Sequence, residues 1–440
     1  MSGIIFGRDT IVSRSGMGFV QKLSSDVSLD PSESLIEDCS ESHVLVVAPT
    51  GAGKGRNFII PNLLHYDGPA IVVDIKGEAA AVTANYRRNK LGHKVVVIDP
   101  WGKSGQQQSG FNPLDYLKFD PENLEDNALS LASMISGRNL SNIREPFWDE
   151  RARSLVSGLL ADHATASDIA DRSMQHLWQT ANAIEDSIMF HRRIESETIH
   201  PFARSQYVSY ANVSADVTRC GIHATAMSHM SAFVGQAARQ ATADTGFALE
   251  DIIAGEKLTI YLVFPPSKLE SHAALLRMWL TALIGLITER RVRPRKPTLL
   301  MIDELAHIGP LSAIKQAVTL ARGYGLRCAL FVQSYAQLAA MFKDDHTTIL
   351  ENCGSICTFG HKSIGKCQDI SRALGDITAR ELCDLSGDRL AVSGLAPETL
   401  VAKRIDYLTD PMFEGRFAAN PFFEEWTPPQ RQQQGGRGRQ

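Results

Sequence analysis

The stretch that decides the fold is "VLVVAPTGAGKGRNFIIPNLL", residues 44–64. It opens with a short β-branched apolar run, which predicts a buried parallel strand over 43–48. Pro49 and Thr50 break this run, and the glycines that follow let backbone N–H groups turn inward around an anion. An apolar helix begins after Lys54, and the N-terminus of a helix favours phosphate. This order of strand, loop and helix predicts a nucleotide-binding loop formed by Thr50, Gly51, Ala52, Gly53, Lys54 and Gly55.

Gly55 departs from the usual pattern of such loops. The lysine is normally followed by Ser or Thr, whose hydroxyl holds Mg²⁺. Here Lys54 is followed by Gly55. Because Mg²⁺ is commonly bound by one or two protein oxygens together with phosphates and waters, the loss of this hydroxyl is expected to weaken metal affinity rather than abolish the site.

The sequence "PTLLMIDELAHIG", residues 297–309, supplies the second half of a nucleotide site. A buried apolar strand ends there in Asp303 and Glu304, and ligands bind at this edge of open α/β sheets. Asp303 is the candidate ligand of Mg²⁺, through water, and Glu304 the candidate residue that orients or deprotonates the attacking water. The alternative is that the two acids only stabilise the N-terminal dipole of a helix. The nucleotide-binding loop upstream, with Lys54, makes this alternative less favoured.

Strand and helix signals alternate from residue 43 onward, and this alternation implies a parallel sheet covered by helices. Between 119 and 240 helical spacing replaces the strand signal, so we expect an inserted helical domain. Strands are predicted at 70–75, 94–98, 258–264, 298–302, 327–332 and 355–359, and a helix at 78–90. The predicted division is an N-terminal segment (1–42), a nucleotide-binding domain in two parts (43–118 and 241–426), an all-helical domain (119–240) and a disordered tail (427–440).

Composition describes an ordinary globular protein of more than one domain, with 440 residues of which 44% are apolar and 21% charged. A net charge of −4 excludes a surface that coats polyanions, so any nucleic-acid contact must come from local basic patches. The seven scattered cysteines predict a reducing compartment rather than a disulfide framework. Cys353 and Cys357 are expected to be core residues rather than metal ligands.

No uninterrupted apolar run reaches the ~18 residues of a membrane span. The longest, at 273–288, contains Arg277 and is expected to form a buried helix. The N-terminus lacks the basic and apolar regions of a signal peptide. These features predict a cytoplasmic protein.

Several blocks of the sequence resemble the coupling-protein family of type IV secretion and conjugation. They occur in order from about residue 42 to 415, and the glycine after the loop lysine is itself typical of this family. The blocks are "APTGAGKG", "IIPNLL", "VVDIKGE", "DPW", "FNPLDYL", "FWDERAR", "LLMIDELAHIG", "VQSYAQL", "TILENCGS" and "KRIDYLTDPMFEGRF".

The resemblance implies an α/β fold in which a RecA-like P-loop nucleotide-binding domain carries an inserted all-helical domain and assembles as a homo-hexamer. It implies an ATPase that uses ATP and Mg²⁺, recruits relaxase-bound single-stranded DNA or effector proteins, and contacts inner-membrane components of a type IV secretion channel. Carried onto this sequence, Lys54 binds phosphate, Asp303 and Glu304 serve Mg²⁺ and water, Gln333 senses the γ-phosphate, and Arg322 is the candidate arginine finger.

Arg322 ends the predicted helix "AIKQAVTLAR", residues 313–322. We expect this position on the rim of the domain, within reach of a neighbouring subunit's ATP. The alternative is that Arg322 only complements the C-terminal dipole of its helix. Arg327 is a weaker candidate because it begins the following strand, at the edge away from the nucleotide.

Two further assignments have open alternatives. Gln333 could cap the helix after its strand instead of sensing phosphate. Asp74, Lys76 and Glu78 of "VVDIKGE" form either a solvated turn or a contact to the nucleotide.

The functional hypotheses fall into different classes. The leading one is an ATPase that translocates DNA or protein, favoured by Glu304, Arg322 and Gln333. The rival is a cargo receptor whose nucleotide site drives assembly. A double-stranded DNA translocase would share the motor but not the blocks "FNPLDYL" and "FWDERAR". Members of the resembled family usually begin with transmembrane helices, which this sequence lacks, so we expect either a trimmed or a soluble form docked at the bacterial inner membrane.

Overall fold

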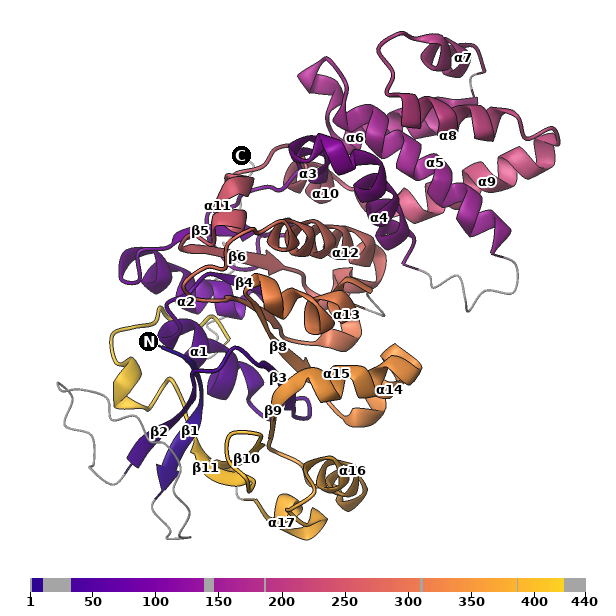
Figure 1. Cartoon of the computed structure of the whole chain (residues 1–440). Helices are drawn as coiled ribbons and strands as arrows, with labels where there is room; N and C mark the ends of the chain where they lie inside the picture. The colour runs from indigo at the N-terminus through magenta and orange to yellow at the C-terminus, as the bar shows by residue number, and fades with distance from the viewer. Residues whose placement is uncertain are drawn as a thin grey trace, which may run out of the picture.

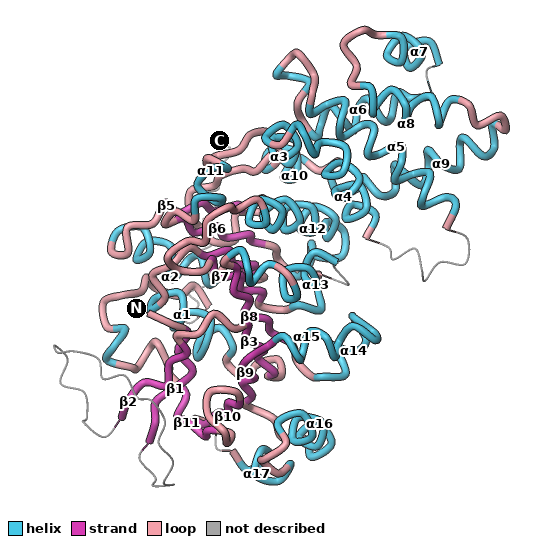
Figure 2. The backbone as a smooth tube through the Cα atoms, in the orientation of Figure 1, coloured by secondary structure: helices cyan, strands magenta, loops and turns pink. Residues whose placement is uncertain are grey.

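This computed structural model describes residues 2–10, 33–137, 146–185, 187–308, 312–385 and 387–422. A single sheet runs through all of it except the end that holds helices α4 to α9 (Figure 2). Its strand order is β2-β1-β11-β10-β9-β3-β8-β7-β4-β6-β5. The predicted tail, 427–440, lies outside the described residues. The strands are β1 Ile4–Thr10, β2 Glu33–Asp38, β3 His43–Val47, β4 Ala70–Asp74, β5 Lys94–Ile98, β6 Leu258–Val263, β7 Thr298–Ile302, β8 Leu326–Val332, β9 Cys353–Thr358, β10 Arg389–Ser393 and β11 Leu400–Arg404.

The half of the sheet from β9 to β5 is parallel throughout. Every strand in it was predicted from the sequence, with bounds that differ by at most a few residues. Alternate side chains of β3 enter different cores: Val44 and Val46 pack on one face, Leu45 and Val47 on the other. Since both faces are covered, these strands are mostly apolar, as parallel strands usually are.

Helices cover both faces of the parallel half (Figure 1). Side chains of α1 and α2 pack into the core on one face, and those of α12 to α15 into the core on the other. The helices are α1 Ile60–His65, α2 Glu78–Asn89, α3 Pro113–Phe119, α4 Leu124–Ser136, α5 Phe147–Ala164, α6 Met174–Asn182, α7 Ser187–Glu195, α8 Pro201–Ala211, α9 Asp216–His229, α10 Gln236–Ala241, α11 Leu249–Ala254, α12 Pro266–Thr288, α13 Ser312–Thr319, α14 Tyr335–Phe342, α15 His346–Asn352, α16 Ile364–Leu374 and α17 Ala379–Asp384.

Helices α4 to α9 gather at one end of the molecule, beyond α12 (Figure 1). Helix α12 shares one hydrophobic core with this group and with the sheet. Its Trp279 is fully buried and donates its indole N–H to the Phe111 carbonyl at 2.8 Å. Arg277 of α12 donates to the Met134 carbonyl of α4 at 3.0 Å. Among the described residues, α12 alone has the length and apolar composition of a membrane span, and 61% of its most apolar window is buried within the protein.

Four antiparallel strands extend the sheet and were not predicted. β10 pairs with the edge strand β9, and β11, β1 and β2 follow in turn. The segment 1–42, which the sequence set apart, therefore contributes two strands to the same sheet as the nucleotide loop. The buried Asn62 side chain fixes β1, since its amide accepts from Ile5 N–H and donates to Ile5 C=O, both at 2.8 Å.

A buried ion pair ties β2 to the parallel half of the sheet. The Arg327 guanidinium at the start of β8 donates to Asp38 Oδ2 at 2.5 Å and to the Ser42 carbonyl at 2.8 Å. The two charged side chains are only 2% and 6% exposed. Arg327 is thus engaged within its own chain, which agrees with its lower rank as a finger.

We predict that Asp38→Ala lowers the free energy of unfolding by about 3–5 kcal/mol, because it leaves the buried Arg327 charge without its partner. The matched control is Asp369→Ala, which removes an exposed ion pair with Arg372 and should cost less than about 1 kcal/mol. Urea unfolding of the three proteins measures both values. Equal stability of the two variants would show that β2 does not depend on this contact.

Candidate nucleotide-binding site

The loop after β3 is shaped by two glycines in the left-handed region of backbone conformation. Gly51 has φ +78° and Gly53 φ +92°. A Cβ atom on Gly53 would lie 2.4 Å from Asn57 Oδ1, so only glycine fits there. The Asn57 N–H donates back to the Gly53 carbonyl at 2.8 Å and closes the loop onto the following helix.

The helix after the loop begins with a π-helical turn over Gly55–Ile59, in which the Ile60 N–H donates to the Gly55 carbonyl. Such turns are frequent at functional sites. The glycine loop thus leads directly into the N-terminus of a helix, an arrangement that favours anions, and the binding of phosphate there stays a prediction from the sequence.

Lys54 folds back over the loop. Its ammonium donates to the Ala48 carbonyl at 3.2 Å and lies 3.3 Å from Glu304 Oε2. The Lys54 and Glu304 side chains are 11% and 9% exposed, so the two charges interact where water screens them little. The β3 loop and the end of β7 therefore meet at one point, although 250 residues separate them in sequence.

Glu304 is held by two amides in addition to Lys54. Gln333 Nε2 donates to its Oε2 at 2.9 Å, and Gln337 Nε2 to its Oε1 at 3.1 Å. Gln337 also accepts from the Gln333 N–H at 2.7 Å. The structure thus brings Lys54, Glu304 and Gln333 together. Sequence reasoning missed Gln337, although its spacing of four residues from Gln333 within "VQSYAQL" was a usable signal.

Asp303 lies beside this group, at the end of β7. Its backbone N–H donates to the Val73 carbonyl of the parallel neighbour β4 at 3.3 Å. Burial raises the pKa of the Asp303 carboxyl to about 6; the Lys54 and Lys76 charges lower it, and Glu304 raises it. Its environment is therefore one in which a nearby cation would favour the ionised form.

The donor set fits Mg²⁺ as a partial site. Its candidate ligands here are carboxylate oxygens, which this hard cation prefers. Within the described parts of the chain, no group of three or more His, Cys, Asp or Glu side chains could hold a metal ion. Such a site needs phosphate and water oxygens to complete the coordination of the ion, which is how Mg²⁺ is usually bound beside nucleotides.

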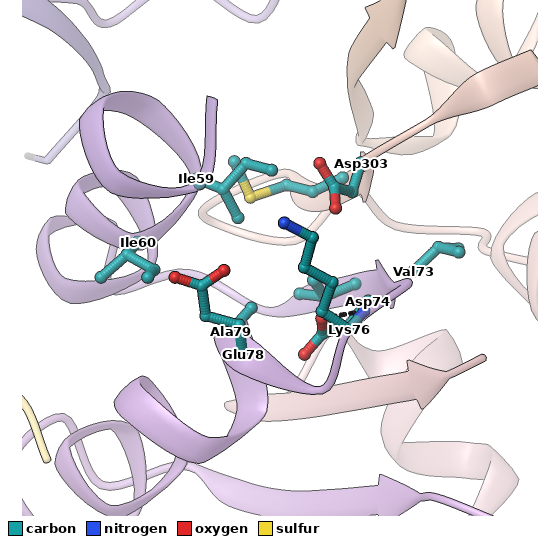
Figure 3. Close-up of a pocket in the computed structure, with 11 residues that line it drawn as sticks. Ile59, Ile60, Val73, Asp74, Lys76, Glu78, Ala79 and Asp303 are labelled. Atoms are coloured by element: carbon teal, nitrogen blue, oxygen red, sulfur yellow. Dashed lines mark hydrogen bonds between the residues drawn. The ribbon is translucent and has the colours of Figure 1, made fainter. Parts of the chain in front are cut away.

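The "VVDIKGE" turn has a structural part and an exposed part. Asp74 is buried and accepts from the N–H groups of Lys76, Gly77 and Ala80 at 3.3, 2.9 and 2.9 Å. Burial raises the pKa of Asp74 to about 7, against the effect of these hydrogen bonds. Asp74, Lys76 and Glu78 all line the same pocket as Asp303, and Lys76 is the exposed member of the turn (Figure 3). The solvated-turn alternative is therefore wrong for Asp74, which organises the turn from within.

The segment after β10 clamps the loop from outside and was also missed. Arg404 donates to the Ala52 carbonyl at 2.6 Å and stacks its guanidinium 5.1 Å from the centre of the Phe359 ring. The Asn57 amide donates to the Ile405 carbonyl at 2.8 Å. These residues belong to "KRIDYL", a block that carried the family resemblance without a stated role.

Arg322 lies apart from this cluster. Helix α13 ends at Thr319, three residues before the predicted end, and Arg322 sits exposed in a 3₁₀ turn over Ala321–Tyr324. This turn precedes β8, which runs parallel to β3, so Arg322 is at the sheet edge opposite the loop. It cannot reach Lys54 of its own chain.

We predict that Arg404→Ala loosens the loop, because it removes the donor to Ala52 and the contact with Phe359. Amide hydrogen exchange at residues 50–56 should accelerate while exchange in β5 is unchanged. The control is Arg380→Ala. The Arg380 side chain is 90% exposed and pairs with Asp384 rather than with the loop. Unchanged exchange at 50–56 in Arg404→Ala would show that the clamp is dispensable.

Comparison with known proteins places these features in one family. The sequence matches the family described as "Type IV secretory system Conjugative DNA transfer" over residues 12–383. It is 27% identical over 354 residues to the type IV secretion system-coupling protein VirD4 of Bartonella henselae, covering 78% of this chain and 54% of that protein. It is 26% identical over 350 residues to the conjugal transfer protein TraG of Agrobacterium fabrum, covering 77% and 51%. The chain spans about half the length of these curated relatives.

Solved structures confirm the fold. The plasmid coupling protein TrwB in complex with GDPNP, a non-hydrolysable GTP analogue, superposes with a TM-score of 0.62 at 16% identity, covering 88% of this chain and 90% of that one. TrwB with ADP and Mg²⁺ gives a TM-score of 0.61. The predicted α/β class, a RecA-like P-loop domain with a helical insertion, is therefore confirmed. The family model matches most of the length of this chain, residues 12–383. The chain therefore belongs to the type IV secretory system conjugative DNA transfer family.

Proposed function

We propose that this protein is an ATPase that drives DNA, or protein attached to it, into a type IV secretion channel. The observation that carries the proposal is the convergence of Lys54, Gln333 and Gln337 on the Glu304 carboxylate. A glycine-rich loop alone would suit a receptor that binds nucleotide without hydrolysing it. A positioned carboxylate beside the loop lysine suits hydrolysis, and this favours the enzyme over the cargo receptor.

Each residue has a defined task in this reaction. The loop N–H groups and Lys54 bind the phosphates. To do so, the Lys54 ammonium leaves the Glu304 carboxylate and contacts a phosphate oxygen instead. Bound Mg²⁺ would neutralise charge on the β- and γ-phosphates, with Asp303 as its protein ligand through water. Glu304 orients the attacking water and accepts its proton, while Gln333 connects the γ-phosphate to Glu304.

In this proposal Arg322 contacts the ATP that is bound to a neighbouring subunit. It is exposed at the sheet edge opposite its own loop, so a head-to-tail arrangement would bring it to another subunit's site. Apolar side chains on the same edge support such a contact, since Leu320 is 65% exposed, Val292 80% and Tyr324 38%. The proposed active assembly is a homo-hexamer.

The proposed cargo and location rest on the resemblance found in the sequence and on the description of the matching family, which names conjugative DNA transfer. The proposed cargo is single-stranded DNA bound to a relaxase, or an effector protein. The proposed location is the cytoplasmic face of the inner membrane, in contact with other secretion components. ATP hydrolysis measured with and without single-stranded DNA tests this function. Stimulation by DNA is expected, and nucleotide binding with no turnover under any condition would support the receptor instead.

We predict that Lys54→Ala lowers ATP hydrolysis about 100-fold or more, because the phosphates lose their only cation from the loop. Glu304→Gln should bind ATP normally but slow its hydrolysis by about 10² to 10⁴, because an amide cannot accept the proton of water. Lys366→Ala, at an exposed lysine of α16, is the matched control and should behave as wild type. Normal turnover by Lys54→Ala or Glu304→Gln would refute the site assignment.

We predict that Arg322→Ala also abolishes hydrolysis, since an arginine finger contributes about 10³ to 10⁵ in rate. Mixing it with Lys54→Ala should restore part of the activity, because a mixed ring contains sites with an intact loop beside an intact finger. Hydrolysis is measured under assembly conditions with DNA, with each variant alone as control. Mixed oligomers without any recovery would mean that Arg322 does not act in trans.

A further inference from the structure

Gly55 occupies the position at which loops of this type usually supply a hydroxyl. A Cβ atom built on Gly55 would lie 3.5 Å from Glu78 Oε2 and 3.9 Å from Oε1, which is ordinary contact distance. The Glu78 carboxylate therefore lies in contact distance of the position at which the side chain of the missing Ser or Thr would begin. This carboxylate comes from the turn after β4, so the chain delivers an oxygen to the same place from a different element.

The Glu78 side chain is held in a defined orientation. Glu78 is the first residue of α2 and follows Gly77, whose φ of +79° makes the turn. Its Oε1 accepts from the amide of the buried Asn420 at 2.7 Å, and the Asn420 amide also contacts the Tyr407 hydroxyl at 2.7 Å. Oε2, the oxygen nearer Gly55, makes no hydrogen bond to any residue that the structure describes.

Glu78, at the start of α2, and Asp303, just after β7, approach one pocket from different elements. Both line it, and Lys76 lies between them in the view of Figure 3. Within the described residues Lys76 forms no ion pair with Glu78 or Asp303. A simple structural explanation is that Glu78 complements the N-terminal dipole of α2, which would need neither the orientation by Asn420 nor the approach to Gly55.

We propose that the Glu78 carboxylate takes the place of the absent loop hydroxyl and helps to bind hydrated Mg²⁺, across the pocket from Asp303. This inference rests on the proposed nucleotide site and assigns a residue within it. Two carboxylates with phosphates and waters make a complete set of oxygen ligands for Mg²⁺. The glycine after the lysine is then compatible with an intact metal site, because Glu78 compensates for it.

The test compares the Mg²⁺ requirement for binding a fluorescent ADP in wild type, Glu78→Gln, Gly55→Ser and the double variant. Glu78→Gln should need about tenfold more Mg²⁺ for half-maximal effect, the size expected for losing a carboxylate around a metal. ADP binding in EDTA should be unchanged. Adding Gly55→Ser to Glu78→Gln should restore the lower requirement, because the serine hydroxyl returns to the usual position. Glu250→Gln, an exposed acid in the first turn of α11, is the matched control.

An unchanged Mg²⁺ requirement in Glu78→Gln, or a failure of Gly55→Ser to lower it in the double variant, would overturn the assignment. Equal loss of ADP binding with Mg²⁺ and in EDTA would also overturn it, since that pattern reports a structural role. Absence of ADP binding by wild type itself would reject the proposed function. A failure of the proposed function therefore shows as a wild type that does not bind ADP, whereas a failure of the Glu78 assignment shows only in the variants.

Discussion

The contact between the Lys54 ammonium and the Glu304 carboxylate is the interaction on which the site depends. It exists only because the strand order places β8 between β3 and β7, so that the ends of these parallel strands meet at one edge. Gln333 leaves β8 at the same edge and closes the group around Glu304. The low exposure of Lys54 and Glu304 strengthens their interaction, because water screens it little. In the proposed reaction Gln333 and Gln337 hold the carboxylate in place when Lys54 moves to phosphate.

Segments distant in sequence support the loop that carries Lys54. Arg404 and Ile405 contact it directly, and Asn420 orients Glu78 beside it. The antiparallel strands are built onto the parallel core by fully buried groups such as Asn62 and Arg327. A few defined hydrogen bonds thus connect these outer strands to the loop proposed to bind phosphate.

The parallel half of the fold was predictable because its strands are buried on both faces and its glycine loop has a distinctive order. The four antiparallel strands were not, since β10 and β11 are short and mixed in polarity and form only by pairing with β9 and β1. The end of α13 was placed three residues late because the sequence up to Arg322 remains compatible with a helix. Lys54, Asp303 and Glu304 followed from local motifs. Gln337 was missed although its spacing of four residues from Gln333 was a usable signal. Arg404 and Asn420 act through tertiary contacts that no local pattern encodes.

The most direct test of the account is a crystal structure of this protein with Mg²⁺ and a non-hydrolysable ATP analogue. Phosphate oxygens are expected on the N–H groups of residues 51–55, with Lys54 moved from Ala48 and Glu304 to the phosphates. Glu304 should remain held by Gln333 and Gln337. A nucleotide bound elsewhere, or a Lys54 that stays on Glu304 with the phosphates in place, would contradict the central claim.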